Sequence, residues 1–212
     1  MITLLILLVF VLVIASTWWF GIWNNLLTLI NLLLAGLIAS GFYENVTEQL
    51  NQSMSGWKNV TSFLAVWLTF VVSFMVLRAL TDMISSKKLK FERTTEIIGQ
   101  SVLSVWIACV FLAFMLFTLH LSPLPPTAFQ EDPASSTLGI GPDRFWLAFV
   151  QSRSRGALST PKEESLVADK FTGPSHPDDA ELDARVFDAE GSFIPTNIIR
   201  RQGLAERKTL IN

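Results

Sequence analysis

Three long stretches of the sequence contain no charged side chain. No Asp, Glu, Lys or Arg occurs in residues 1–43, 59–77 or 97–130. A helix that crosses the hydrocarbon core of a membrane needs about 20 mostly apolar residues, because it rises about 1.5 Å per residue through a core about 30 Å thick. The first stretch is long enough for two such helices, and each of the other two is long enough for one.

The sequence therefore predicts an all-α membrane protein with four transmembrane helices and a transmembrane domain over residues 1–120. The first two helices are separated by a turn near Gly21, because a single helix over residues 1–43 would extend about 65 Å, twice the hydrocarbon thickness. The helices are expected near residues 2–20, 24–43, 59–83 and 95–120.

The remaining residues, 121–212, form a polar tail in which we expect mostly irregular structure. The segment SPLPP ends the fourth helix, and a short amphipathic helix is expected near residues 142–156. Its FWLAFV segment is too apolar to lie free in water, so it should pack on the membrane helices or lie in the lipid interface. Residues 186–194 have the pattern of a two-stranded hairpin, with Gly191 at the position that requires a positive φ.

Charge is distributed unevenly between the loops, and this predicts the orientation of the chain. Residues 78–96 carry five basic and three acidic side chains, a net charge of +2, whereas residues 44–58 carry one basic and two acidic side chains, a net charge of −1. The tail carries ten basic and thirteen acidic side chains, a net charge of −3. Because Lys and Arg are retained on the cytoplasmic side, residues 78–96 should lie inside and the tail outside.

The basic residues of that loop are interpreted as a topology signal that faces the lipid headgroups. They are Lys87, Lys88, Lys90 and Arg93. One helical turn separates Arg78 from Asp82, so these two side chains are expected to form an ion pair at the inner membrane boundary.

Small and polar residues recur at helical spacing inside the predicted spans. Such stripes permit close backbone approach and hydrogen bonds between helices, so we interpret them as helix-packing surfaces. A polar transport pathway is the other interpretation, but no ionisable residue lies at membrane depth in these stripes. The predicted packing residues are Asn24, Thr28, Asn31, Ala35, Ala39, Ser62, Thr69, Ser73, Ser101 and Ser104.

The layout of the chain over about residues 1–120 resembles the CvpA (colicin V production protein) family. The resemblance rests on four helices with short loops, on Gly21 at the turn into the second helix, on Glu92-Arg93 at the end of the basic loop, and on Gly99 in the fourth helix. It implies a multi-pass protein of the bacterial inner membrane that is linked to colicin V production or export.

The sequence departs from the family pattern at two places. Asn24 stands where the family tends to have an arginine after the first glycine, and Leu103-Ser104 replaces a later Arg-Gly pair. The tail lies outside the part of the chain that the resemblance explains.

No catalytic, cofactor or metal site is predicted. His120 and His176 lack metal-ligand spacing to another His or Cys, and Cys109 has no second cysteine with which to pair. The sequence contains no nucleophile elbow and no phosphate-binding glycine-rich loop. The basic run is also too short to indicate binding of a nucleic acid.

These observations favour a non-enzymatic accessory or scaffold protein in toxin export or envelope processes. Its expected partners are the lipid bilayer and either another membrane protein or further copies of itself. A small channel or transporter subunit formed by oligomerisation is the alternative.

Overall fold

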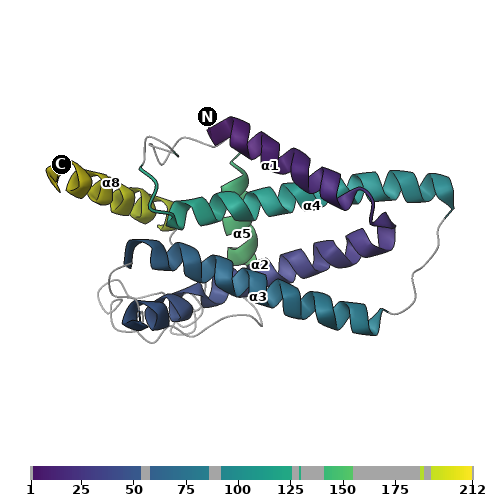
Figure 1. The fold of residues 1–212 in the computed structure, drawn as a ribbon, viewed down its shortest axis with the longest axis horizontal. Coiled ribbons are helices and arrows are strands. Elements are labelled where there is room, and N and C mark those ends of the chain that lie inside the picture. The colour runs from purple at the N-terminus through teal and green to yellow at the C-terminus, as the bar shows by residue number, and fades with distance from the viewer. Residues whose placement is uncertain are drawn as a thin grey trace, which may run out of the picture.

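The computed structural model describes residues 2–53, 58–85, 92–125, 129, 141–154, 187–188 and 192–211. Within these residues all regular secondary structure is helical, with no strand (Figure 1). The helices are α1 (Ile2–Thr17), α2 (Gly21–Ser53), α3 (Lys58–Ile84), α4 (Arg93–Leu121), α5 (Pro142–Ser154) and α8 (Phe193–Ile211).

Three of these helices, α2, α3 and α4, are long and apolar enough to cross a membrane. The prediction of four transmembrane helices is therefore corrected to three. The helix α1 has 16 residues and rises only about 24 Å, less than the hydrocarbon thickness. It ends at Thr17, whose hydroxyl donates to the carbonyl of Val13 (2.9 Å), and the chain reverses at Gly21, which has a φ of 76°.

The three long helices form a bundle with α2 in contact with both α3 and α4, while α1 packs on α4 (Figure 1). Ala35 and Ala39 on α2 are fully buried in the main core. Phe114 and Phe117 on α4 belong to the same core. The main core thus combines small side chains of α2 with large aromatic side chains of α4, which permits close packing.

The helix α2 extends ten residues beyond the predicted end at residue 43. Residues 44–53, expected in a loop, continue the helix as ENVTEQLNQS. This segment contains no Gly or Pro to interrupt helical hydrogen bonding, and the Thr47 hydroxyl donates to the carbonyl of Tyr43 (2.7 Å). The polar end of α2 consequently projects past the apolar part of the bundle.

The two ends of the bundle differ in composition. At one end, here called the basic-loop end, α2 begins, α3 ends and α4 begins. At the opposite end, here called the tail end, α2 and α4 end and α8 lies beside the end of α4 (Figure 1).

The predicted helix near residues 142–156 is present as α5, and it packs against α4. Its buried apolar residues Trp146, Leu147 and Val150 belong to the main core. The FWLAFV segment therefore packs on the membrane helices, as its apolar composition predicts.

The predicted hairpin over residues 186–194 is wrong where the structure describes it. Phe187 and Asp188 form a turn, and Phe193 and Ile194 begin α8 instead of a strand. Asp188, with a φ of 51°, accepts a hydrogen bond on its Oδ1 from the Phe193 N–H (2.9 Å), which satisfies a donor at the start of the helix. Gly191 lies outside the described residues.

Candidate functional site

The tail end of the bundle gathers aromatic, charged and amide side chains from α2, α4, α5 and α8, and it forms the candidate site. Trp146 of α5 lies against both α2 and α4. Its Nε1 donates a hydrogen bond to Ser40 Oγ on α2 (3.1 Å), and its ring centroid lies 5.3 Å from that of Phe114 on α4. The indole thereby fixes α5 across two membrane helices.

Gly36 leaves the space that this indole occupies. A Cβ atom added at Gly36 would lie 2.5 Å from Cη2 of Trp146, closer than carbon atoms can approach. A residue with a side chain at this position of α2 would push the tryptophan out. The contact between the tail and the membrane helices thus requires a glycine here.

A fully buried ion-pair geometry joins α4 to α5. His120 Nε2, near the end of α4, lies 3.0 Å from Asp143 Oδ2 in the first turn of α5. Both side chains are inaccessible to solvent. The interaction between them therefore offsets part of the free energy that burial of each polar group costs. The remaining atoms, His120 Nδ1 and Asp143 Oδ1, have no hydrogen-bond partner among the described residues.

Two adjacent arginines of α8 lie beside this pair. Arg200 donates from Nη2 to the carbonyl of His120 (3.3 Å), and Arg201 donates from Nη1 to the carbonyl of Phe129 (2.6 Å). The Arg201 guanidinium carbon also lies 5.4 Å from the centroid of the Phe129 ring, in cation–π range. Burial lowers the pKa of both guanidinium groups, and the charge of Arg200 lowers the pKa of Arg201 further.

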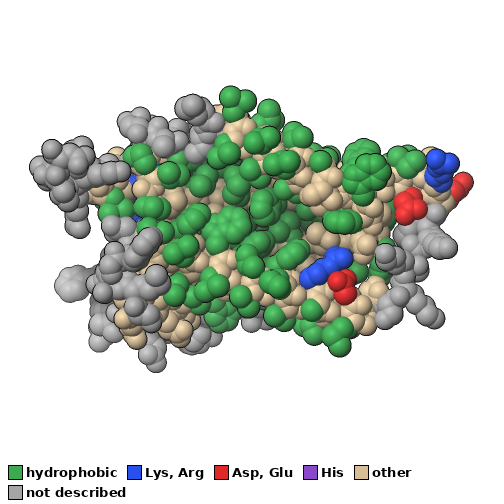
Figure 2. Space-filling view, viewed as in Figure 1, with side chains coloured by type: hydrophobic (Ala, Val, Ile, Leu, Met, Phe, Trp, Pro, Cys, Tyr) green, Lys and Arg blue, Asp and Glu red, His purple; other side chains and the backbone are tan. Residues whose placement is uncertain are grey.

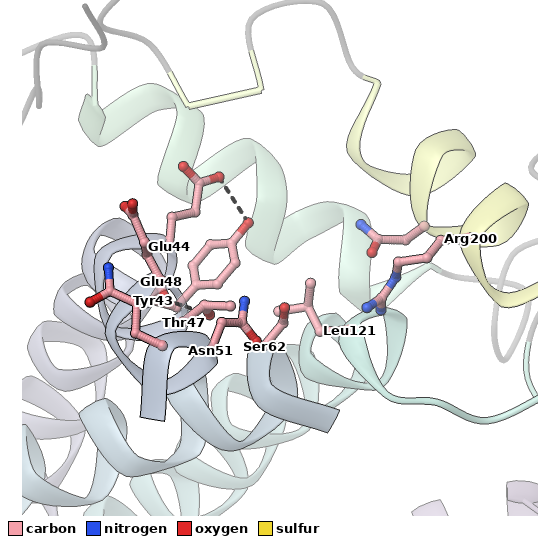
Figure 3. A pocket seen from close by; sticks show the side chains of 10 residues that line it. Tyr43, Glu44, Thr47, Glu48, Asn51, Ser62, Leu121 and Arg200 are labelled. Atoms are coloured by element: carbon pink, nitrogen blue, oxygen red, sulfur yellow. Dashed lines mark hydrogen bonds between the residues drawn. The ribbon is translucent and has the colours of Figure 1, made fainter. Parts of the chain in front are cut away.

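A pocket of about 660 Å³ opens next to Arg200, between the end of α2 and α8 (Figure 3). Glu44 and Glu48 approach it from α2, and Arg200 approaches it from α8. The Tyr43 hydroxyl donates to Glu44 Oε1 (3.2 Å) at one side. The lining residues are Tyr43, Glu44, Thr47, Glu48, Asn51, Gln52, Ser62, Leu121, Asn197 and Arg200.

The chemistry of this lining suits a polar ligand that carries a positive and a negative group at separate positions. Carboxylates stand on the α2 side, a guanidinium stands on the α8 side, and amide groups of Asn51 and Gln52 offer both donors and acceptors. The pocket was not predicted from the sequence, because residues 44–58 were expected to form a loop. The spacing of residues 44, 47, 48, 51 and 52, typical of one helical face, is the signal that indicates it.

At the basic-loop end, a second polar network connects α2 with α3. The buried Asn31 donates from Nδ2 to Thr81 Oγ1 (2.9 Å), and Arg78 donates from Nη1 to Thr28 Oγ1 (3.1 Å). Arg78 Nε lies 3.1 Å from Asp82 Oδ2. The structure thus joins the predicted packing residue Thr28 to the predicted pair on α3, and joins Asn31 to Thr81 between the two members of that pair.

The corresponding contact between α2 and α4 uses Asn25. Its buried amide donates to Ser104 Oγ (3.1 Å) and to the carbonyl of Gln100 (3.3 Å). The predicted packing residue Asn24 is half-buried, and its carbonyl accepts the Thr28 hydroxyl. The sequence spacing did not distinguish Asn24 from its neighbour, because a shift of one residue changes the helix face by about 100°.

The other predicted residues occupy varied positions. Thr69 and Ser101 donate to carbonyls four residues earlier in their own helices, and Ser73 is half-buried on α3. Ser62 lines the pocket at the tail end. Arg93 is exposed at the start of α4, whereas Lys87, Lys88 and Lys90 lie outside the described residues.

Across the described ranges, no group of three or more His, Cys, Asp or Glu side chains has the geometry of a metal site. Cys109 is exposed on the surface of α4.

The part of the chain that contains the membrane helices matches a known protein family. Residues 2–138 match the family described as colicin V production protein. The chain belongs to the colicin V production protein family. The match extends past the 1–120 region of the predicted resemblance and includes α1–α4, whereas α5 and α8 lie beyond it. No curated protein and no solved structure matches the chain.

Family membership and three long apolar helices together make this a multi-pass membrane protein and support an accessory role in the membrane. Within the candidate site, Tyr43, Ser40 and His120 come from the matched part of the chain. Trp146, Asp143 and the two arginines come from the tail. The candidate site therefore combines a family membrane core with side chains from outside the match.

Proposed function

We propose that this protein is a non-enzymatic accessory or scaffold protein of the bacterial inner membrane, acting in colicin V production or export or in a related envelope process. Membership of the colicin V production protein family supports this class of function. The observation that carries the choice of scaffold over channel is the aromatic packing in the interior of the bundle.

Aromatic rings from three helices fill the space between α3, α4 and α5. The ring centroids of Phe70 and Phe114 are 4.6 Å apart, and Trp67 contacts both of these rings at 5.8 and 6.0 Å. Trp146 of the tail continues the cluster at 5.3 Å from Phe114. Conduction requires water or polar groups along the whole pathway. An interior filled with aromatic rings therefore favours a structural and binding role over conduction.

The charge distribution supports an orientation with the basic-loop end in the cytoplasm. The +2 charge of residues 78–96 favours that side, and the −3 charge of the tail favours the outer side. In this orientation the candidate site at the tail end lies at the outer face of the inner membrane. A partner in the envelope would meet α5, α8 and the pocket there.

Purified protein in liposomes tests the choice between scaffold and channel. We expect no flux of ions or small solutes above that of empty liposomes. The variant Trp146→Ala removes the tail's contribution to the aromatic cluster and shows whether the tail closes a pathway. Reproducible flux through the unaltered protein, abolished by Asn31→Leu, would establish the channel and overturn the scaffold.

Cross-linking in native membranes tests the binding role. A photoreactive residue in place of the exposed Phe145 on α5 should capture an envelope protein or a second copy of the chain. A photoreactive residue in place of Val102, exposed on α4 away from the tail end, is the matched control. Equal capture from both positions would contradict a partner surface on the tail.

A further inference from the structure

One face of α3 carries a regular stripe of side chains that are exposed, except for one that is half-buried. Successive members are separated by four, three, four, three and four residues, which is the spacing of the a and d positions in a coiled coil. The members, called here the α3 stripe, are Leu64, Leu68, Val71, Met75, Arg78 and Asp82.

The apolar part of the α3 stripe lies opposite the face that packs within the protein, and Arg78 lies where the stripe meets α2. Ala65, Val66 and Phe70 are buried against the core, whereas Leu68 and Met75 are 52% and 65% exposed. Of the three spanning helices, α3 is the least enclosed, with 22% of its apolar window buried against 39% for α2 and 44% for α4. Among these three helices, α3 therefore leaves the largest share of its apolar window outside the protein interior.

The stripe ends in two opposite charges near the end of the helix. Arg78 lies six residues before Ile84, a rise of about 9 Å, and Ile84 and Met83 beyond it are exposed apolar residues. The side chains of Arg78 and Asp82 are 32% and 55% exposed. Figure 2 shows a basic and an acidic side chain lying together within a hydrophobic surface. Charged side chains beside an apolar, lipid-facing surface are stabilised when a polar partner covers them.

We propose that the α3 stripe binds the α3 stripe of a second copy of this chain, in a parallel dimer with two-fold symmetry. Two-fold symmetry places the same patch on both partners, so a self-complementary patch is required. The stripe meets this requirement because it carries one cation and one anion one helical turn apart. Arg78 of each copy then approaches Asp82 of the other, and the four charges form a closed network.

The apolar part of the stripe fits the same arrangement. A repeat averaging 3.5 residues keeps Leu64, Leu68, Val71 and Met75 against the partner along the helix. Arg78 is already held by Thr28 of α2 and by its own Asp82, so its guanidinium is positioned before a second copy arrives. Preorganisation of this kind reduces the entropy lost on association.

Single cysteines on and off the stripe test the contact. Cys109 is first replaced by Ala, and Leu68→Cys, Met75→Cys and the control Val102→Cys are made separately in that background. Oxidation in native membranes should convert Met75→Cys or Leu68→Cys to a disulfide dimer. Val102→Cys, equally exposed but on α4, should yield several-fold less. Equal yields at the stripe and at the control would overturn the proposal, because random collision in the membrane then explains both.

Charge reversal tests the proposed network and separates it from the ion pair within one chain. With Met75→Cys as reporter, Asp82→Arg gives a copy with two arginines, and Arg78→Asp gives a copy with two aspartates. Each variant alone should lose cross-linking several-fold, because like charges face each other across the symmetry axis.

Co-expression of these two variants with different tags should restore the dimer between unlike copies. Neither copy regains its own intrachain pair in this mixture, so a purely structural role of Arg78 and Asp82 predicts no recovery. Recovery of the mixed dimer supports the proposal. Failure of the mixed dimer to exceed either homodimer would contradict it and would assign the two charges to the lipid headgroups.

Discussion

The indole of Trp146 on α5 occupies the space above Gly36 on α2, where an added Cβ atom would come within 2.5 Å of Cη2. The same indole donates to Ser40 Oγ one turn further along α2. One side chain of the tail thus contacts two neighbouring turns of a membrane helix. This relationship explains how a segment more than 100 residues away in the sequence becomes part of the bundle.

Replacement of Gly36 by Ala should displace Trp146 and destabilise the protein. Overpacking of a core typically costs about 1–3 kcal/mol. The thermal unfolding temperature in detergent should fall, and proteolysis of the tail should become faster. Gly41→Ala is the matched control on the same helix, since nothing lies within 4 Å of its added Cβ. An equal response of both variants would contradict the proposed steric contact.

Removal of the Asp143 carboxylate should leave the buried His120 without its partner. An unsatisfied buried polar group costs about 1–3 kcal/mol. Asp143→Ala should therefore lower the free energy of unfolding by about that amount. Asp143→Asn should lower it less, because an amide oxygen still accepts a hydrogen bond from the imidazole. Denaturant unfolding of the two variants measures the difference, and equal loss in both would show that hydrogen bonding contributes little there.

Enlargement of Ala35 should separate α2 from its neighbours. Ala35 is fully buried in the core, so Ala35→Leu introduces three extra carbon atoms without space for them. We expect a fall in the unfolding temperature equivalent to about 1–3 kcal/mol. Ala15→Leu makes the same chemical change at an exposed position on α1 and should have little effect. An unchanged unfolding temperature for Ala35→Leu would show that the larger side chain fits without loss of stability, and it would contradict the predicted packing surface on α2.

The orientation of the chain predicts a labelling pattern in whole cells. In a Cys109→Ala background, Ser175→Cys should react with a membrane-impermeant maleimide and Lys88→Cys should not, because the basic loop should face the cytoplasm. Both positions lie outside the described residues, so the prediction rests on charge alone. Permeabilised cells provide the control in which both cysteines react. Labelling of Lys88→Cys but not of Ser175→Cys in intact cells would reverse the orientation.

Helical segments were the most predictable feature of this protein. Charge-free runs located α2, α3 and α4, because a chain in lipid must satisfy its backbone hydrogen bonds within each segment. Apolar composition likewise indicated that FWLAFV packs on the bundle. These features depend on local composition, which is written directly in the sequence.

Contacts between segments were much less predictable. The helical spacing included Asn24, whereas Asn25 makes the buried contact with Ser104. The hairpin pattern at residues 186–194 failed because the stacking of Phe193 on Phe117, with centroids 5.0 Å apart, and the bond from Phe193 N–H to Asp188 favour the start of a helix. The hairpin error and the unpredicted contact of Asn25 both concern which face of a segment meets another segment.

The sequence by itself determined that this is a membrane protein with apolar helices, a basic loop and a polar tail. Only the tertiary structure decided that α1 is too short to span, that His120 meets Asp143, and that Trp146 enters the bundle at Gly36. The physical reason is that helix insertion depends on local interactions, whereas contacts between segments depend on residues far apart in the sequence. Insertion of a helix depends on the sum of its own side chains, whereas a buried pair depends on two segments whose relative position is set by the packing of all the others.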